Sequence, residues 1–421
     1  MSDAQVAFYG DDFTGSVDAL LQFVRSGLTG QLFVGLPPGD ALRQAADECD
    51  VIGIAGISRS LGTAELDAEV RPVLEALAAL HPAVVQYKAC STADSAPSVG
   101  SLGRVIEIAR DVFGSRPVPL LFAQPDFGRY TAFGHHFAAE GGRIYRLDRQ
   151  PTMSNHPTTP MTESDLALHL ARQTSLPIGG ISFTEYTSAH ALTERLRDAS
   201  EAGVVLDALD GAQVALVGHA VAGLPATAFA IGSGGLSLGL GQASPRSTQP
   251  GARGTITRLT TPGAVLVVSG SRSAQTRRQA DAAARAGWHV EPLRLPADEA
   301  SLERVAAVLR SGTSVVLTSD DADVPAAGTL MAIATAAAAF VDEAVRRAGV
   351  RRVIVCGGDA SSRITRLLGV ESLSIAANPW GNVVLLRAGC ADPQLDGLEL
   401  LLKGGQVGAQ DLFDKVRTLG S

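Results

Sequence analysis

The chain has 421 residues, of which 46% are hydrophobic, 45 are glycine and only 5% are aromatic. This composition is typical of compact α/β proteins, and the length predicts two or three domains. The formal net charge of −8 argues against a nucleic-acid partner, because phosphate backbones are bound by clustered Lys and Arg. No apolar run is long enough to predict a membrane span, and the N-terminus lacks the regions of an export signal, so we expect a cytoplasmic protein.

Lysine is rare in this chain. Of 35 basic residues only Lys88, Lys403 and Lys415 are lysines, so a lysine inside a motif is a slightly stronger indication of function than usual. The four cysteines form no Cys-x-x-Cys pair, and the sequence therefore predicts neither a zinc site nor a disulfide framework.

The N-terminal stretch Val6–Asp18 combines a strand, a tight turn and a helix. Its apolar run ends at Gly10, the carboxylates Asp11 and Asp12 follow, and Thr14-Gly15-Ser16 leads into a segment of helical periodicity. Both acids are therefore expected at the carboxyl end of a strand, where ligands bind in open α/β sheets. Either acid could instead only cap the helix, and the pattern leaves that alternative open.

Strands and helices alternate through the first half of the chain. Strands are predicted at six further places, residues 30–36, 51–55, 84–88, 119–124, 178–182 and 204–208. Helical segments such as 63–79 lie between them. This alternation favours a parallel, doubly wound sheet with helices on both faces.

Polar residues follow these strands. The strand 51–55 leads to Ser58-Arg59-Ser60, and the strand 84–88 leads to Cys90-Ser-Thr-Ala-Asp94. Because parallel strands end at one edge of their sheet, we expect five side chains in one crevice, those of Asp11, Asp12, Arg59, Lys88 and Ser91. Such a crevice suits a small polyhydroxylated acid, since an arginine can hold a carboxylate with two hydrogen bonds and carboxylates accept from hydroxyls. Taken alone, Arg59 could also be a solvated loop charge.

Three other segments of the first half carry partial motifs. His135-His136 could suggest a metal site, but neighbouring residues of a strand point to opposite faces and no His-x-x-x-His pattern occurs, so we predict no protein metal ligands. Residues 145–162 are predicted to form an ordered excursion near the site. Gly232-Ser-Gly-Gly235 does not match a dinucleotide fingerprint and follows no clear strand, so we predict a close-packed turn.

A domain boundary is predicted at residues 242–253, whose Ser, Pro and Gly content is typical of an exposed linker. We expect an N-terminal domain at residues 1–243 and a C-terminal domain at residues 254–421. The second domain again alternates, with strands predicted near 263–269, 314–318 and 352–356 and an alanine-rich helix at 332–347.

Two turns of the second domain suit a nucleotide. Gly357-Gly358-Asp359 opens a helix whose N-terminus favours a phosphate, and Ser269-Gly-Ser271 offers backbone N–H groups and hydroxyls to an anion. Near the end, Gly404-Gly405-Gln406 follows Lys403. No Gly-x-x-x-x-Gly-Lys-Ser/Thr sequence occurs, so a nucleotide site has to be built from these separate turns.

Five motifs together resemble the four-carbon acid sugar kinase family. They are Gly10-Asp-Asp-Phe-Thr-Gly15, Gly128-Arg-Tyr-Thr131, Val268-Ser-Gly-Ser271, Gly357-Gly-Asp-Ala-Ser-Ser362 and Leu402-Lys-Gly-Gly-Gln-Val-Gly408. Each is weak alone, but the ordered set spans nearly the whole chain.

The resemblance implies two α/β domains, each a mostly parallel sheet flanked by helices, with the active site in the interdomain cleft. The N-terminal domain would bind the sugar acid, the C-terminal domain would bind ATP, and Mg²⁺ would bridge the phosphates. Substrate binding is implied for Arg59, Lys88, Ser91, Thr92 and Asp94. ATP binding is implied for Ser269, Ser271, Gly357, Gly358, Asp359, Gly404, Gly405 and Gln406. We expect Asp12 to take the proton of the substrate hydroxyl, with Asp11 as the alternate.

One departure concerns the substrate. Much of the family resembles Lys-x-Asp-Ser-Thr-Leu-Arg-Gly, where this chain has Lys88-Ala-Cys-Ser-Thr-Ala-Asp-Ser95. Cys90 stands in place of an acid and Asp94 in place of an arginine, which changes the charge of the expected sugar-acid pocket. The pattern is similar to that of kinases for oxidised or branched acids, 3-oxo-isoapionate among them.

The leading hypothesis is an ATP-dependent kinase for a small four-carbon or branched five-carbon sugar acid or oxo-acid. A non-catalytic sensor that binds sugar acid and nucleotide is the alternative, and a dehydrogenase is disfavoured because no dinucleotide fingerprint follows a strand. The sequence leaves the oligomeric state open, a homo-oligomer included.

Overall fold

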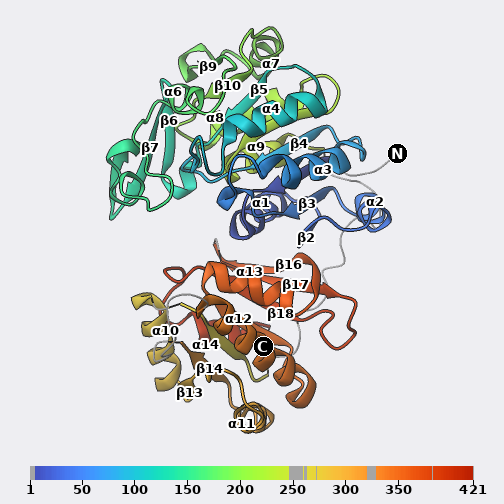
Figure 1. Ribbon diagram of the computed structural model, residues 1–421, viewed down its shortest axis with the longest axis vertical. Helices are drawn as coiled ribbons and strands as arrows, with labels where there is room; N and C mark the ends of the chain where they lie inside the picture. Colours follow the sequence, from blue (N-terminus) through green and yellow to red (C-terminus); the bar gives the residue numbers. More distant parts are fainter. Residues whose placement is uncertain are drawn as a thin grey trace. The chain divides into compact units, whose positions relative to one another are not determined.

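The computed structural model describes residues 5–245, 259, 263–271, 273–319, 329–381 and 383–420. The chain divides into two compact units, Met1–Gly254 and Thr255–Ser421 (Figure 1). Most of the expected linker, residues 246–253, lies outside the described residues.

Unit 1 is built on a parallel sheet with the strand order β2-β3-β1-β4-β11-β5-β10-β9. Its strands are β1 (Val6–Gly10), β2 (Gly30–Phe33), β3 (Val51–Ala55), β4 (Val84–Lys88), β5 (Val118–Leu121), β9 (Ile178–Ile181), β10 (Gly203–Leu206) and β11 (Ala228–Gly232). Its helices are α1 (Phe13–Arg25), α2 (Gly39–Glu48), α3 (Leu66–Ala78), α4 (Leu102–Phe113), α5 (Pro151–Ser154), α6 (Leu166–Ala171), α7 (Ala189–Arg197), α8 (Gly211–Ala222) and α9 (Gly234–Ala243).

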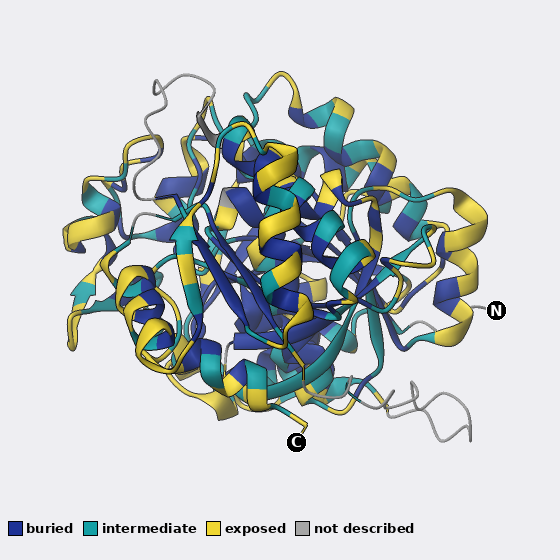
Figure 2. Ribbon diagram, turned by 90° about the horizontal axis from the view of Figure 1, so that it is seen from below, coloured by how far each residue is buried: buried dark blue, intermediate teal, exposed yellow. Residues whose placement is uncertain are grey.

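The central strands are covered on both faces. Every residue of β1, β3 and β4 is buried, which explains why these strands read as continuous apolar runs. On one face of β1, Phe8 stacks on Phe23 of α1 with ring centroids 5.8 Å apart, and on the other Tyr9 packs against Tyr87 at 5.4 Å. Figure 2 shows buried strands beneath helices whose outer faces are exposed. The polar residues that follow these strands are therefore set on a rigid base.

A small antiparallel sheet is attached at the carboxyl ends of the parallel strands. It consists of β6 (Arg129–Ala132), β7 (His135–Glu140) and β8 (Arg143–Arg146). Thr131 forms a bridge with Ala208, just after β10, and the Asp207 carboxylate accepts hydrogen bonds from the N–H groups of Phe133 and Gly134 at 2.7 and 3.0 Å. The β6–β7 hairpin is thus tied to the edge of the sheet where the candidate site lies.

The interpretation of Gly232–Gly235 was wrong in one respect. The turn does follow a strand, β11, which lies in the middle of the sheet between β4 and β5. Its sequence Ala-Phe-Ala-Ile-Gly has one β-branched residue, Ile231, beside two alanines and a glycine that disfavour a strand. A fully buried strand of this kind depends on its neighbours rather than on propensity. The close packing is present, since a Cβ on Gly235 would lie 1.9 Å from the carbonyl oxygen of Ala123.

Unit 2 has the strand order β13-β14-β12-β15-β18-β17-β16. The first five strands are parallel, whereas β17 and β16 are antiparallel additions at one edge. The strands are β12 (Leu266–Ser269), β13 (His289–Pro292), β14 (Val315–Thr318), β15 (Arg352–Cys356), β16 (Val370–Trp380), β17 (Val383–Cys390) and β18 (Glu399–Lys403). The helices are α10 (Ala274–Arg285), α11 (Glu299–Arg310), α12 (Thr329–Ala348), α13 (Gly358–Leu367) and α14 (Leu412–Thr418).

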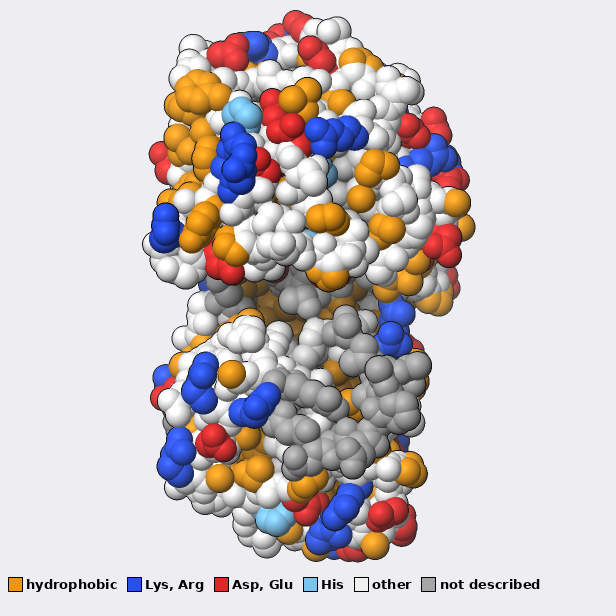
Figure 3. Space-filling model, turned by 60° about the vertical axis from the view of Figure 1, so that its left-hand side comes forward, with side chains coloured by type: hydrophobic (Ala, Val, Ile, Leu, Met, Phe, Trp, Pro, Cys, Tyr) orange, Lys and Arg blue, Asp and Glu red, His pale blue; other side chains and the backbone are white. Residues whose placement is uncertain are grey.

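Charges on the surface are mixed. On the face drawn in Figure 3, basic and acidic side chains are interspersed. Exposed ion pairs such as those of Arg197 with Glu194 and Asp198 each contribute little to stability, about 0–1 kcal/mol. Across the parts of the chain that the structure describes, no helix is long and apolar enough to cross a membrane.

Alanine at Gly218 should destabilise unit 1 by roughly 1–3 kcal/mol, the usual cost of overpacking. Helices α8 and α9 touch backbone to backbone there, and a Cβ on Gly218 would lie 2.1 Å from the carbonyl carbon of Gly239. Gly211→Ala in the same helix is the control, because nothing lies within 4 Å of its Cβ position. Thermal and urea unfolding of both variants would measure the difference, and equal stabilities would contradict the close contact.

Candidate active site

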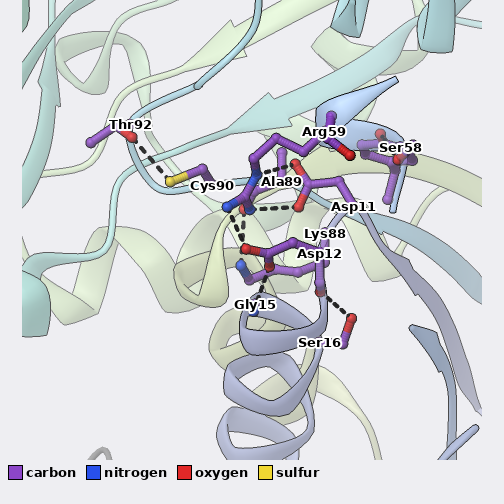
Figure 4. A network of polar contacts seen from close by, with 12 residues as sticks. Asp11, Asp12, Gly15, Ser16, Ser58, Arg59, Lys88, Ala89, Cys90 and Thr92 are labelled. Carbon is purple, nitrogen blue, oxygen red and sulfur yellow. Dashed lines mark hydrogen bonds and ion pairs between the residues drawn. The ribbon is translucent and has the colours of Figure 1, made fainter. Parts of the chain in front are cut away.

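Asp11, Asp12 and Arg59 form an ion-pair cluster at the carboxyl ends of β1 and β3 (Figure 4). Arg59 lies on the short 3₁₀ helix Ser58–Ser60 that follows β3. Its Nη2 and Nε donate to the two oxygens of Asp11 at 2.6 and 3.1 Å, and its Nη1 donates to Oδ2 of Asp12 at 2.5 Å. The expected convergence of these residues is present, and Arg59 is not a free loop charge.

The two carboxylates differ in exposure. The side chain of Asp11 is 2% exposed, whereas that of Asp12 is 32% exposed. Asp12 is also the N-cap of α1, because its Oδ1 accepts from the N–H of Gly15 at 2.6 Å. Asp12 therefore caps the helix as one interpretation predicted, and its Oδ2 lies at the Arg59 side of the cluster. Only Asp12 is open to a small molecule.

Asp11 and Arg59 shift each other's pKa. Burial raises the pKa of Asp11, and the charge of Arg59 opposes that rise. Burial also lowers the pKa of Arg59, but Asp11 and Asp12 raise it more, so the pKa of the guanidinium lies well above its usual range. Arg59 therefore keeps its positive charge, and it lies between the two acids.

Lys88 completes the group. Its side chain is buried, and its Nζ donates to the carbonyl oxygen of Ala89 at 2.9 Å. A Cβ on Gly15 would lie 2.5 Å from Oδ1 of Asp12 and 3.1 Å from this Nζ, so the absence of a side chain at Gly15 leaves room for the ammonium group beside the first turn of α1. Figure 4 shows Lys88, Asp12 and Arg59 pointing toward one another.

The turn after β4 holds the other expected substrate residues. The Sγ of Cys90 lies 3.0 Å from Oγ1 of Thr92, and the carbonyl of Ser91 accepts from Nε2 of a histidine on β7. Asp94 turns away from the cluster, since its carboxylate accepts from the hydroxyl of Thr159. Asp94 therefore connects the turn to the segment 145–162 rather than to Asp11, Asp12 and Arg59.

His136 is the histidine that holds this turn. Its Nε2 lies 2.8 Å from the carbonyl oxygen of Ser91 and its Nδ1 2.9 Å from Oγ1 of Thr131. A carbonyl only accepts, so Nε2 carries the proton and Nδ1 accepts from the threonine hydroxyl. Burial lowers the pKa of His136 to about 4. Among the described residues no group of three or more His, Cys, Asp and Glu could hold a metal ion.

In unit 2 three turns at the carboxyl ends of β12, β15 and β18 are bound together. Gly270 N–H donates to the carbonyl of Cys356 at 2.9 Å, Gly357 N–H donates to that of Lys403 at 2.8 Å, and the hydroxyl of Ser273 donates to that of Gly405 at 2.5 Å. The expected nucleotide residues therefore lie on adjoining loops.

Several details of these loops suit an anion. Helix α13 begins after Gly357, whose φ is +118°, and no side chain caps its first N–H groups. Lys403 is buried, and its Nζ donates to Oγ1 of Thr276 at 3.2 Å and to the carbonyl of Gly404 at 3.1 Å. This structural role was not predicted from the sequence. The rarity of lysine in the chain was the feature of the sequence that could have indicated a role for Lys403. Gln406 is exposed, and the side chain of Asp359 lies outside the described part.

The stability of unit 1 should fall as the pH drops from about 6.5 to about 4. His136 is neutral in the fold down to a pKa of about 4, whereas an unfolded histidine binds its proton near 6.5. Stabilisation is therefore full above about 6.5, and roughly 3 kcal/mol is lost below about 4. Thermal unfolding between pH 4 and 7 should show a flatter dependence in His136→Gln, while the exposed His219→Gln should follow the wild type. An unchanged slope in His136→Gln would contradict a neutral buried imidazole.

Comparison with known proteins agrees with this two-unit layout. A family model described as a sugar-binding N-terminal domain matches residues 6–240, and one described as a nucleotide-binding C-terminal domain matches residues 266–413. A Haemophilus influenzae protein of known structure shares the fold, with a TM-score of 0.77 over 99% of this chain and 100% of that chain at 22% identity.

Relatives of known activity match along nearly the whole length. A 3-oxo-isoapionate kinase of Paraburkholderia graminis is 38% identical, over 98% of this chain and 94% of that protein. A 3-oxo-tetronate kinase of Pseudomonas fluorescens is 32% identical, over 96% and 94%, and a D-threonate kinase of Bordetella bronchiseptica is 27% identical, over 98% and 96%. The chain therefore belongs to the family of acid sugar kinases that combine a sugar-binding N-terminal domain with a nucleotide-binding C-terminal domain.

Proposed function

We propose that the protein is an ATP-dependent kinase that phosphorylates a hydroxyl group of a small sugar acid. The observation that carries the proposal is the partly exposed Asp12 carboxylate, which the buried Asp11–Arg59 pair holds at the carboxyl end of β1. The names of its full-length relatives support the same reaction class. They also favour a kinase over a non-catalytic sensor.

Asp12 acts as the general base in this proposal. Its Oδ2 accepts the proton of the acceptor hydroxyl, whose oxygen then bonds to the γ-phosphorus of ATP while the bond to the β-phosphate oxygen breaks and ADP leaves. Asp11 is too buried to reach a substrate. It holds Arg59, which in turn orients Asp12.

Lys88 balances charge near the transferred group. Its ammonium lies beside the first turn of α1, where the free N–H groups of the helix also favour negative charge. Phosphoryl transfer depends mainly on positioning and on neutralisation of charge, so a buried lysine at this point suits the chemistry. Ser91 and Thr92 lie in the turn that follows Lys88 and β4, and their side chains offer hydroxyl groups to a polyhydroxylated substrate.

The nucleotide is assigned to unit 2. The uncapped start of α13 at Gly357 and Gly358, with Ser269, Ser271, Gly404 and Gly405 on the adjoining loops, suits the phosphates. Asp359 and Gln406 stay in the proposal from their place in the motifs. Mg²⁺ supplies further charge neutralisation when it is bound with ATP. Mg²⁺ commonly takes phosphate and water oxygens with one or two carboxylates, so it does not require a protein cluster of three acids or histidines. Within the Asp11, Asp12 and Arg59 cluster, Asp12 is the more exposed of the two carboxylates.

The substrate is proposed to be an oxidised or branched acid. The relatives with 38% and 32% identity are named for 3-oxo acids. Cys90 and Asp94 stand where much of the family has an acid and an arginine, which changes the charge of the turn after β4. Because the substrates of a kinase include ATP, we also place the reaction in the cytoplasm.

Asp12→Asn should fold normally and lose turnover by roughly 10²- to 10⁴-fold, the usual contribution of a general base. The amide oxygen can still cap α1, but it cannot take the proton. Asp210→Asn is the control, because Asp210 caps α8 in the same way through the N–H of Gln213 at 2.9 Å. Steady-state rates with thermal unfolding would separate catalysis from folding, and a fully active Asp12→Asn enzyme would remove the assignment.

ADP release with Mg-ATP should occur with at least one member of a panel of D-threonate, D-erythronate, 3-oxo-tetronate and 3-oxo-isoapionate. The 3-oxo acids are expected to give the highest kcat/KM. EDTA should abolish turnover if the metal accompanies ATP. A protein that is stabilised by these acids and by ATP, yet releases no ADP with any of them, would support the sensor instead.

A further inference from the structure

Arg129, the first residue of β6, forms no ion pair with a carboxylate among the residues that the structure describes, although Glu140 is near enough to oppose the fall in its pKa that burial causes. Its Nη1 donates to the carbonyl oxygens of Phe127 and Ala139 at 2.8 and 3.2 Å. Its Nε is inaccessible to solvent and has no hydrogen-bond partner. A guanidinium group keeps its charge, and a partly buried charge without a counter-ion is unfavourable. This arrangement is one that an incoming anion would complete.

The guanidinium lies on the side of the hairpin that faces the candidate site. Side chains alternate along a strand, so Arg129 and Thr131 of β6 share one face, and the register places Ala138 and His136 opposite them on that face. His136 binds the carbonyl of Ser91, which shows that this face packs on the Cys90–Thr92 turn. Burial lowers the pKa of Arg129, and Cys90 of this turn and Glu140 of β7 oppose that fall.

Arg59, by contrast, is already bonded to two carboxylates of the protein. Its Nε, Nη1 and Nη2 all donate to Asp11 or Asp12, and two carboxylates surround its single positive charge. A third carboxylate at Arg59 would have to share a guanidinium group that already bonds two acids, and it would be repelled by both. The carboxylate of the sugar acid is therefore expected to bind a cation other than Arg59.

We propose that Arg129 binds the carboxylate of the sugar acid and that Cys90 keeps this arginine available. The inference rests on the proposed kinase function and adds the residue that recognises the acid group. A side-on pair through Nε and Nη2 would supply two charge-assisted hydrogen bonds. An aspartate in place of Cys90, as in the Lys-x-Asp-Ser-Thr pattern, would offer Arg129 an internal partner and compete with the substrate.

Arg129→Gln tests the assignment directly. In the ADP-release assay it should lower kcat/KM for the acid by roughly 30- to 1,000-fold, mainly through KM, as expected when one partner of a charged pair is lost. The KM for ATP should change less than about twofold, because the nucleotide residues lie in unit 2, and Arg129→Lys should recover part of the loss by restoring the charge. Arg143→Gln is the matched control, since this exposed arginine of the same small sheet lies over the ring of Tyr145.

Cys90→Asp provides a second test that leaves Arg129 in place. It should raise KM for the acid about tenfold or more, whereas Cys90→Ser should not, because only the aspartate supplies a competing carboxylate. The shift in unfolding temperature caused by each acid of the panel, measured without ATP, gives a readout that does not need turnover. The neutral polyol threitol, the reduced counterpart of threonate, should cause the same small shift in wild type and in Arg129→Gln.

The outcomes separate the two proposals. If wild type turns over an acid and Arg129→Gln keeps its KM within about twofold, the carboxylate assignment is overturned while the kinase stands. If wild type turns over no acid, the kinase proposal fails, and the temperature shifts still decide the role of Arg129. If Arg129→Gln does not fold, the recovery in Arg129→Lys and the contrast between Cys90→Asp and Cys90→Ser decide it.

Discussion

The site depends on the charge compensation between Asp11 and Arg59. A carboxylate that is 2% exposed at the end of a buried strand is unfavourable by itself, and removal of one partner from such a pair typically costs about 3–5 kcal/mol. Arg59, in the loop after β3, neutralises this carboxylate. The ion pair also fixes the distance between the ends of β1 and β3. Asp12 then receives its orientation from the same guanidinium. The position of Oδ2 of Asp12, the proposed base, is thus a consequence of how a buried charge is neutralised.

A similar logic of fixed loops applies in unit 2. The turns after β12, β15 and β18 are joined by hydrogen bonds between main-chain groups. The hydroxyls of Ser273 and Thr276 also donate to the main-chain carbonyl of Gly405. Gly405 makes this possible, because a Cβ there would lie 2.2 Å from Oγ of Ser271. A phosphate-binding surface made from several short loops does not require the single continuous motif of a P-loop.

Much of this arrangement could be predicted from local patterns, and the exceptions have physical causes. The strands β1, β3 and β4 were found because full burial makes them continuous apolar runs, and the polar residues after them were placed at the same edge for that reason. β11 was missed, since its alanines carry no strand signal and its place is set by β4 and β5. The roles of His136 and Arg129 depend on how a hairpin folds over the Cys90–Thr92 turn. Contacts between residues so far apart in the chain cannot be seen in a local pattern.

The N-cap of α1 has a consequence for the turnover cycle. In the proposed mechanism Asp12 holds the first turn of α1 through Oδ1 and takes the acceptor proton on Oδ2. A neutral carboxyl group is a weaker partner for the N–H of Gly15 and for Arg59 than a carboxylate is. Protonation therefore weakens the start of the helix and its contact with the buried pair, and both recover when the proton passes to water. The interactions of the folded chain thus favour return of Asp12 to the carboxylate form, with water as the proton acceptor and no second side chain required.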